Sequence, residues 1–181
     1  MKIILLRHAQ STSNQANRAD SQIDSELSPQ GKKDAETLVS KLSMFTIDLF
    51  VVSPLIRTKQ TIQPLLNKYK HPAVIFSDLT LERNLGDWNG TPLGAFQKYC
   101  DEHHFNKITH RPKNGESIQD LYQRALQFLS FLKEHITKKT ILVCGHKNFL
   151  LCLEIALTDK NIANYYVHTA LEPTQFRILT I

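Results

Sequence analysis

Short apolar runs alternate with longer segments of helical period along this chain. Five runs of three to six residues are rich in β-branched residues and leucine, at residues 3–6, 49–52, 74–76, 140–143 and 175–180. Between them, apolar side chains recur at spacings of three and four, as in the segment from Leu121 to Leu132. This alternation is typical of parallel strands joined by helices. The pattern therefore predicts an α/β fold with a mostly parallel central sheet flanked by helices.

Capping signals indicate where several helices begin. Ser28 followed by Pro29 predicts a helix that starts at this proline and continues through Leu42. Ser117, with Asp120 three residues later, resembles a capping box ahead of a long amphipathic segment. Three further helices are expected: one after Pro54 toward Tyr69, one after a cap signal at Thr91-Pro92, and one from Asn148 to Leu157.

The segment from about Gly90 to Gly115 interrupts the alternation of strands and helices. We expect a small helical insertion, or lid, near residues 90–115. The sequence has no internal repeat and no low-complexity linker, and 181 residues are enough for one self-sufficient core. The sequence therefore predicts a single domain over residues 1–181.

Composition narrows the class of protein. Apolar residues make up 41% of the chain and charged residues 22%, as in soluble globular proteins. The first apolar run is too short for a signal peptide, and no run approaches the roughly 20 residues that span a bilayer. The three cysteines include no C-x-x-C pair, so they indicate neither a disulfide framework nor a zinc site. We expect a cytoplasmic protein without a membrane partner.

The net charge of +5 raises the question of nucleic-acid binding, because a basic face attracts phosphate groups. The basic residues are dispersed along the chain, and no basic stripe is interleaved with aromatic residues. We therefore expect no nucleic-acid partner. The sequence carries no signal for an oligomeric state.

Three predicted strands are each followed by cationic or imidazole side chains. Arg7 and His8 follow the first strand, Arg57 lies shortly after the second, and His146 follows the run at residues 140–143. Ligands of open parallel sheets bind beyond the carboxyl ends of the strands, so these four side chains are expected to converge on one crevice. Arginine binds phosphate through paired hydrogen bonds, and a histidine whose pKa is lowered by nearby arginines is a neutral nucleophile. The pattern predicts an anion pocket with a phosphoryl acceptor.

The residues from Arg7 to Asn14 read RHAQSTSN and resemble R-H-G-[EQ]-[ST]-x-x-N, the signature of the histidine phosphatase superfamily, also called the phosphoglycerate mutase-like family. Five further motifs follow in family order: LSPQG at 27–31, SPLIRTxQT at 53–61, LExxxGxWxG at 81–90, GES at 115–117 and GH at 145–146. By this ordered agreement from Leu5 to about Asn148, the chain is identified as a member of that family.

The resemblance implies roles for five catalytic residues. His8 would become phosphohistidine, and Arg7, Arg57 and His146 would complete the phosphate-binding core. Glu82 matches the general acid of the family, which protonates the leaving oxygen and afterwards activates water. The scheme requires no metal and no cofactor.

Other residues near these motifs bear on substrate binding. Gln10, Ser11 and Asn14 lie where the first loop of the family contacts phosphoryl oxygens or substrate. Ala9 replaces the usual glycine, and its methyl group would cost stability or displace the phosphate if this position required a positive φ or a very close approach of the backbone. Lys147 replaces a glycine that often follows the second histidine. It would either bind a second acidic group of the substrate or point to solvent.

The family contains both phosphatases and mutases. Phosphoglycerate mutases of this type are usually longer, with substrate-holding segments that have no match here. We therefore expect a phosphatase acting on a small phosphorylated metabolite. Two alternatives remain open, a phosphoglycerate-type mutase and a catalytically weakened module that binds phosphate. A metal site at residues 100–104 is disfavoured, because adjacent residues on a helix point in different directions.

Overall fold

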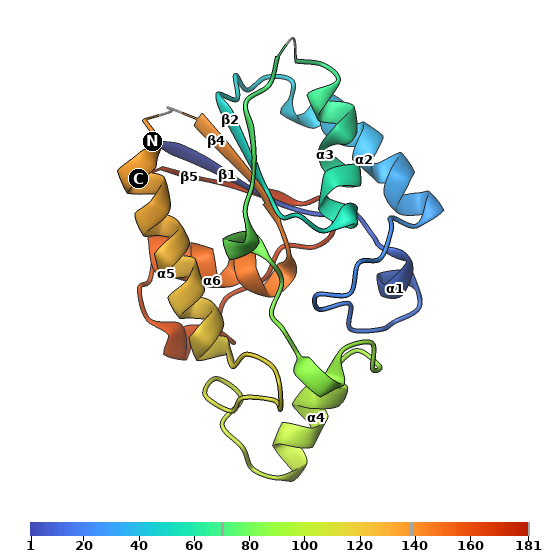
Figure 1. The fold of residues 1–181 in the computed structure, drawn as a ribbon, viewed down its shortest axis with the longest axis vertical. Helices are drawn as coiled ribbons and strands as arrows, with labels where there is room; N and C mark the ends of the chain where they lie inside the picture. The colour runs from blue at the N-terminus through green and yellow to red at the C-terminus, as the bar shows by residue number, and fades with distance from the viewer. Residues whose placement is uncertain (70, 138–139, 181) are drawn as a thin grey trace.

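The computed structural model describes residues 1–69, 71–137 and 140–180. Its centre is a five-stranded sheet with strand order β3-β2-β4-β1-β5 (Figure 1). The strands are β1 (Lys2–Arg7), β2 (Leu49–Val52), β3 (Val74–Phe76), β4 (Thr140–Gly145) and β5 (Phe176–Thr180). The first four run parallel, and β5 pairs with β1 in the antiparallel direction at the edge. The predicted α/β fold with a mostly parallel sheet is confirmed.

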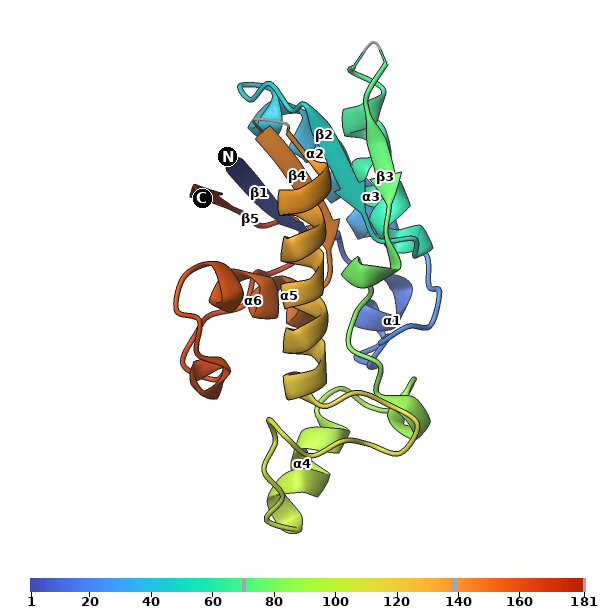
Figure 2. The ribbon, with the colours of Figure 1, turned by 60° about the vertical axis from the view of Figure 1, so that its left-hand side comes forward.

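Helices cover both faces of the sheet. They are α1 (Thr12–Gln15), α2 (Pro29–Leu42), α3 (Ile56–Leu66), α4 (Ala95–Glu102), α5 (Ile118–His135) and α6 (Lys147–Leu157), with 3-10 turns η1 (Asp78–Thr80), η2 (Gly86–Trp88) and η3 (Ile162–Asn164). The pair α2 and α3 lies on one face, and α5 and α6 lie on the other (Figures 1 and 2).

Alternate residues of each central strand supply the two cores. In β1, Ile3 and Leu5 pack with α5 and α6, whereas Ile4 and Leu6 pack with α2 and α3. Successive side chains of a strand point to opposite faces, so a strand covered on both sides must be apolar at every position. This explains the unbroken apolar runs in the sequence.

Most predicted helix ends agree with the structure. Ser28 accepts a hydrogen bond from the Gly31 N–H, and Ser117 and Asp120 form a capping box. The cap predicted at Thr91-Pro92 is wrong, because α4 begins only at Ala95 and its N-cap is Gly94 at φ 86°. Thr91 belongs instead to a turn closed on the Trp88 carbonyl. The helix after Pro54 ends at Leu66, short of Tyr69.

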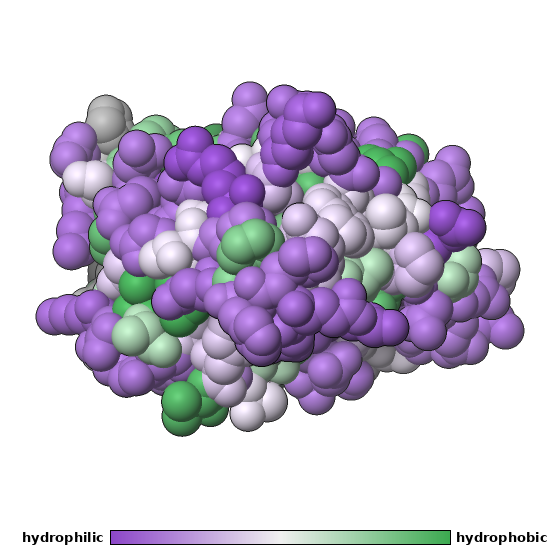
Figure 3. Space-filling view, turned by 90° about the horizontal axis from the view of Figure 1, so that it is seen from below, coloured by the Kyte–Doolittle hydropathy of each residue, from purple (hydrophilic) through white to green (hydrophobic). Residues whose placement is uncertain are grey.

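The predicted insertion near residues 90–115 contains α4 and lies beyond the end of the sheet (Figures 1 and 2). Stacked rings hold it together, among them Phe105 and His110 with ring centroids 4.0 Å apart. Trp88 and Phe96 pack edge to face at 5.6 Å. From this end the surface is mostly hydrophilic, with small separate hydrophobic patches (Figure 3). Within the described ranges, no helix is long and apolar enough to cross a membrane.

Candidate active site

The carboxyl ends of β1, β2 and β4 bring the predicted cationic residues together. The register aligns Arg7 of β1 with Gly145 of β4, and the His8 N–H donates to the Gly145 carbonyl (3.0 Å). The strand ends therefore place His8 beside His146, with ring centroids 5.1 Å apart. Arg57 follows β2 on the first turn of α3. The convergence expected from the sequence is present.

His8 has one protonated and one free ring nitrogen. Its Nδ1 lies 2.7 Å from the carbonyl oxygen of Ala9. A carbonyl can only accept, so Nδ1 carries the proton and Nε2 keeps its lone pair. Burial lowers the pKa of His8 well below its ordinary value, and the charges of Arg57 and Arg7 lower it further. The imidazole is therefore neutral near physiological pH and available as a nucleophile.

His146 is fully buried at the start of α6. Its Nε2 shares a hydrogen bond with Ser53 Oγ (2.8 Å). Burial, followed by the charge of Arg57, lowers its pKa well below the ordinary value. This imidazole is neutral and is fixed by β2 at the side of His8.

The two arginines are held by backbone carbonyls. Arg7 Nη1 donates to Leu171 O (2.7 Å), and Arg57 donates to the carbonyls of Ile23 and Ser21 (2.7 Å each). Carbonyls orient a guanidinium without neutralising its charge. Arg7 also forms an ion pair with Glu172 (3.7 Å), whose side chain is 67% exposed and therefore screened by solvent. Ser21 has a positive φ of 48°, which few residues other than glycine adopt.

Four buried side-chain nitrogens have no hydrogen-bond partner in the described part of the chain. They are Arg7 Nε, Arg57 Nε, Arg83 Nη2 and His146 Nδ1. Buried polar groups are seldom left unpaired, because the cost is about 1–3 kcal/mol each. Three of these four residues line one cavity. The unpaired nitrogens around it fit a site for an anionic ligand.

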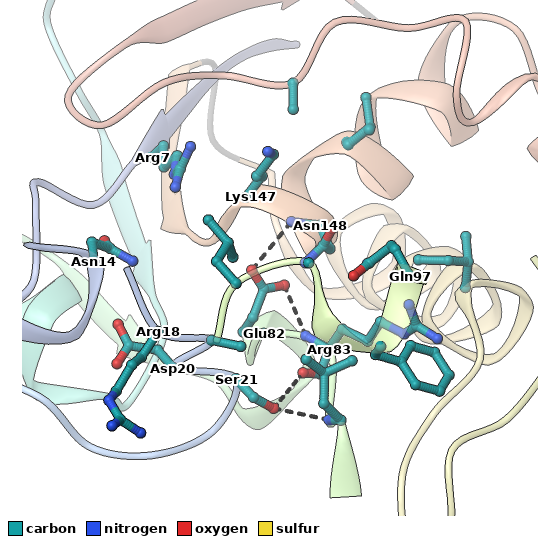
Figure 4. Close-up of a pocket in the computed structure, with 18 of the residues that line it drawn as sticks. Arg7, Asn14, Arg18, Asp20, Ser21, Glu82, Arg83, Gln97, Lys147 and Asn148 are labelled. Carbon is teal, nitrogen blue, oxygen red and sulfur yellow. Dashed lines mark hydrogen bonds between the residues drawn. The ribbon is translucent and has the colours of Figure 1, made fainter. Parts of the chain in front are cut away.

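Glu82 lies against the start of α6. Its carboxylate accepts hydrogen bonds from the N–H of Arg83 (2.8 Å) and from the N–H groups of Asn148 and Phe149 (3.3 Å each). Figure 4 shows Glu82 between Arg7 on one side and the guanidinium of Arg83 on the other. In this position, the carboxylate of Glu82 faces the space in which the leaving group of a phosphoester would lie.

A cavity of about 430 Å³ is lined by Arg7, His8, Arg57 and Glu82, whereas His146 is not among its lining residues. This volume is in the range of pockets that hold small organic molecules. The remaining walls of the cavity are both polar and apolar. They include Arg18, Asp20, Arg83, Gln97, Lys147, Asn148, Leu93, Phe96, Ile118, Leu151, Tyr165 and Tyr166. The insertion supplies one wall through α4 and the turn before it.

The structure divides the predicted substrate-binding residues into two groups. Asn14 and Lys147 line the cavity (Figure 4). Gln10 and Ser11 are not among its lining residues. Gln10 Oε1 accepts from Ser28 Oγ (2.8 Å), while Ser11 caps α1 and donates to Asp20 (2.5 Å). Both side chains are used to shape the loop that follows His8.

Ala9 occupies its position without backbone strain. It is absent from the described residues with positive φ, so the cost expected from such a conformation does not arise. Its methyl group is buried with Leu27 and Ala35, and its N–H donates to Thr61 Oγ1 (2.9 Å). The departure from the family pattern is accommodated by a small apolar cluster.

Arg83 and Asn148 are among the cavity residues that the sequence did not predict as part of the site. Arg83 is only 2% exposed, and its guanidinium lies over the Phe96 ring at 5.2 Å. Asn148 Oδ1 accepts a hydrogen bond from Tyr165 OH (2.6 Å), so the amide nitrogen of Asn148 points away from Tyr165. The sequence signal that could have indicated them is their position, because Arg83 directly follows Glu82 and Asn148 lies shortly after His146.

Comparisons with known proteins agree with this geometry. The family model of the histidine phosphatase superfamily (branch 1) matches residues 3–181. Phosphoserine phosphatase 1 of Hydrogenobacter thermophilus is 29% identical over 172 residues, covering 92% of this chain and 80% of that protein. The 2,3-bisphosphoglycerate-dependent phosphoglycerate mutase of Pseudoalteromonas atlantica is 30% identical over 207 aligned positions, which cover 93% of this chain and 90% of that protein.

Solved structures show the same fold. A mycobacterial glucosyl-3-phosphoglycerate phosphatase superposes with a TM-score of 0.84 at 23% identity, over 99% of this chain and 92% of that one. The α-ribazole phosphatase of Shigella flexneri superposes with a TM-score of 0.86 at 23% identity, over 100% of this chain and 91% of that one. With the motifs in order, the strand ends converging and the family model matching nearly end to end, the chain belongs to the histidine phosphatase superfamily.

Proposed function

We propose that this protein is a phosphatase that hydrolyses small phosphomonoesters through a phosphohistidine intermediate on His8, and that residues 1–181 form one domain of this kind. The observation that carries the proposal is the fixed tautomer of His8. Its Nδ1 is committed to the Ala9 carbonyl, and its pKa is lowered by burial and by two arginines. The free Nε2 is therefore a neutral nucleophile in a positively charged site.

The first half-reaction forms the P–N bond. The Nε2 lone pair of His8 attacks phosphorus as the bond to the leaving oxygen breaks. Arg7 and Arg57 stabilise the charge on the phosphoryl oxygens through preorganised electrostatics. Glu82 donates its proton to the leaving oxygen, so the alcohol departs neutral.

The second half-reaction restores the enzyme. A water molecule attacks the phosphoryl group and breaks the P–N bond, while Glu82 takes a proton from this water. Inorganic phosphate leaves, and His8 returns to its neutral form. The scheme uses side chains alone and needs no metal ion.

Two relatives differ in how closely their alignments follow the length of this chain. The alignment with the phosphoglycerate mutase runs over 207 positions, more than the 181 residues of this chain, so the mutase has segments without counterpart here. The alignment with the phosphoserine phosphatase has 172 positions over 92% of the chain, which leaves little room for insertions. Ala9 lies without strain, which removes one ground for the alternative of a weakened phosphate-binding module.

The leaving group would occupy the part of the cavity beyond Glu82. Arg83 contributes positive charge to this part and Phe96 an apolar wall, while Lys147 lines the cavity nearer to Arg7 (Figure 4). We therefore favour small metabolites whose leaving group carries a further acidic or hydroxyl group. Relatives named for phosphoserine and glucosyl-3-phosphoglycerate support this class of substrate.

The test is phosphate release from p-nitrophenyl phosphate in the presence of a chelator. We expect release by the wild-type protein and loss of release in His8→Ala. Glu82→Gln is assayed with an alkyl phosphate, from which its rate of phosphate release should be lower by on the order of 10²-fold or more. His104→Ala, an exposed histidine of the insertion, is the matched control. Full activity of a folded His8→Ala variant would contradict the proposal.

A further inference from the structure

The side chain of Arg124 holds the segment that carries Glu82. Arg124 lies on α5, and its Nη1 donates hydrogen bonds to the backbone carbonyls of Leu79 (2.9 Å) and Leu81 (2.7 Å). Its Nη2 donates to the carbonyl of Glu82 (3.2 Å). One guanidinium therefore binds three carbonyls within the four residues that end at Glu82.

Glu116 holds Arg124 and the other side of the same segment. Its carboxylate accepts from Nε (3.0 Å) and Nη2 (2.9 Å) of Arg124, which is a bidentate pair. The same carboxylate accepts the N–H of Asn84 (2.9 Å). The two side chains are 14% and 24% exposed, so solvent screens this pair only weakly. Together they bind backbone groups before and after Glu82.

Glu82 depends on such contacts because its segment has no regular secondary structure. Residues 81–85 belong to no helix and no strand. The hydrogen bonds that its carboxylate accepts from the N–H groups of Asn148 and Phe149 are long, at 3.3 Å each. Where the carboxylate lies in the cavity is therefore set by its own backbone. Gln22 donates one hydrogen bond to this backbone, at the Glu82 carbonyl (3.0 Å), whereas Arg124 binds three of its carbonyls.

We propose that Arg124, held by Glu116, is a positioning residue for proton transfer by Glu82. The inference rests on the proposed function, in which Glu82 protonates the leaving oxygen. A displacement of about 1 Å in a reacting group can lower a rate by ~10²-fold. Within the described part of the chain, no hydrogen bond of Arg124 goes to His8 or Arg57. The charge of Arg124 contributes to the lowered pKa of His146, so a test variant has to keep this charge if phosphate binding is to stay in place.

The proposal predicts a dependence on the leaving group. A nitrophenolate leaves without a proton, whereas an alkoxide needs one. Misplacing Glu82 therefore slows the transfer from an alkyl phosphate and has little effect on the transfer from p-nitrophenyl phosphate. A variant that was merely less stable would slow both transfers equally.

The experiment is a double-mutant cycle on the formation of the phosphoenzyme in single turnover. Arg124→Lys keeps the charge but cannot reach all of the acceptors. With glycerol phosphate we expect it to be slower than the wild type by about tenfold or more, and Glu82→Gln to be slower by about 10² or more. The double variant Arg124→Lys/Glu82→Gln should be no slower than Glu82→Gln alone, because no acid is left to position.

Arg111→Lys is the matched control, because Arg111 forms a similar bidentate pair with Asp120 away from the Glu82 segment. It should leave all of these rates unchanged. If Arg124→Lys does not fold, Glu116→Gln takes its place in the cycle, since it keeps an oxygen for the Asn84 N–H.

The two possible failures are distinct. Losses that multiply in the double variant, or equal losses with both substrates, would overturn the positioning role while the acid role of Glu82 stands. Wild-type rates in Glu82→Gln itself would overturn the proposed function, and with it the positioning role.

Discussion

His8 and His146 are neutral because the fold buries both imidazoles among arginines. Their pKa values lie well below the ordinary value of 6.5 in the folded protein, with burial as the largest cause. Below pH 6.5 the unfolded chain therefore binds protons that the folded chain does not bind. By linkage, these two residues make the protein lose stability as the pH falls below 6.5, and have no such effect above it.

Replacing one buried histidine should reduce this pH dependence. Each imidazole accounts for about 1.4 kcal/mol of the stability lost between pH 7.5 and 5.5. In His8→Asn, the difference in the free energy of unfolding between these two pH values should be smaller than in the wild type by that amount. Urea denaturation at both pH values measures it. An unchanged difference would show that His8 titrates normally in the folded protein.

At the scale of residues, sequence patterns predicted the side chains at the fixed positions of motifs and missed those at variable or neighbouring positions. Arg7 ends a strand, His8 and His146 each follow one, and the strand ends bring them together. Arg83 and Asn148 line the same cavity, but an arginine at a variable motif position and an asparagine near the start of a helix look the same in the sequence as solvated ones. Only the folded chain shows that Arg83 is buried.

At the scale of elements, the start of α2 supports the loop that follows His8. The Ser28 N–H donates to the Gln10 carbonyl, and Ser28 Oγ donates to the Gln10 side chain. Gly31 permits this approach, because a Cβ atom there would lie 2.1 Å from the Gln10 carbonyl oxygen. The helix therefore fixes the backbone that in turn orients His8 through the Ala9 carbonyl.

Adding one methyl group at Gly31 should disturb both stability and activity. Gly31→Ala forces the Gln10 backbone to move, which should lower the free energy of unfolding by about 1–3 kcal/mol. The rate of phosphate release should fall as well, because the His8 loop shifts. Denaturation and turnover are measured against Gln30→Ala, an exposed neighbour expected to change stability by less than about 0.5 kcal/mol. Normal stability and turnover in Gly31→Ala would contradict this account.

Element positions followed from periodicity and caps where both signals agreed. The bounds of β2, β3 and α2 match the sequence predictions. The four-residue helix α1 is too short to show a period, and it depends on the capping box between Ser11 and Asn14. The start of α4 was placed too early because a left-handed glycine, Gly94, replaces the polar cap.

At the scale of the whole molecule, the sheet and the insertion contribute different parts of the cavity. The ends of the parallel strands supply His8 and Arg7, whereas the insertion supplies Phe96 and Gln97 (Figures 1 and 4). The α/β fold was predictable from the alternation of elements. How the insertion is placed beside the strand ends was not, because that depends on backbone hydrogen bonds between residues far apart in sequence, such as the one from the Leu93 N–H to the Asn17 carbonyl (2.8 Å).

This division predicts separate effects on phosphate and on substrate. Gln97→Ala removes one polar group from the wall beyond Glu82, which should lower kcat/KM for a matching phosphoester by about fivefold, the value of one hydrogen bond. Inhibition by inorganic phosphate should be unchanged, because phosphate binds at the strand ends. If Gln97→Ala weakened inhibition by phosphate as much as it lowered kcat/KM, this would show that the insertion contacts the phosphate itself.

The central claim is that His8 carries the phosphoryl group during turnover. The direct measurement is rapid acid-free quenching during turnover of p-nitrophenyl phosphate, followed by mass spectrometry of the intact protein and its peptides. The account predicts one added phosphoryl group, located on His8 and absent from a folded His8→Asn variant. A wild-type protein that turns over substrate without any such adduct, or that carries it on another residue, would contradict the account.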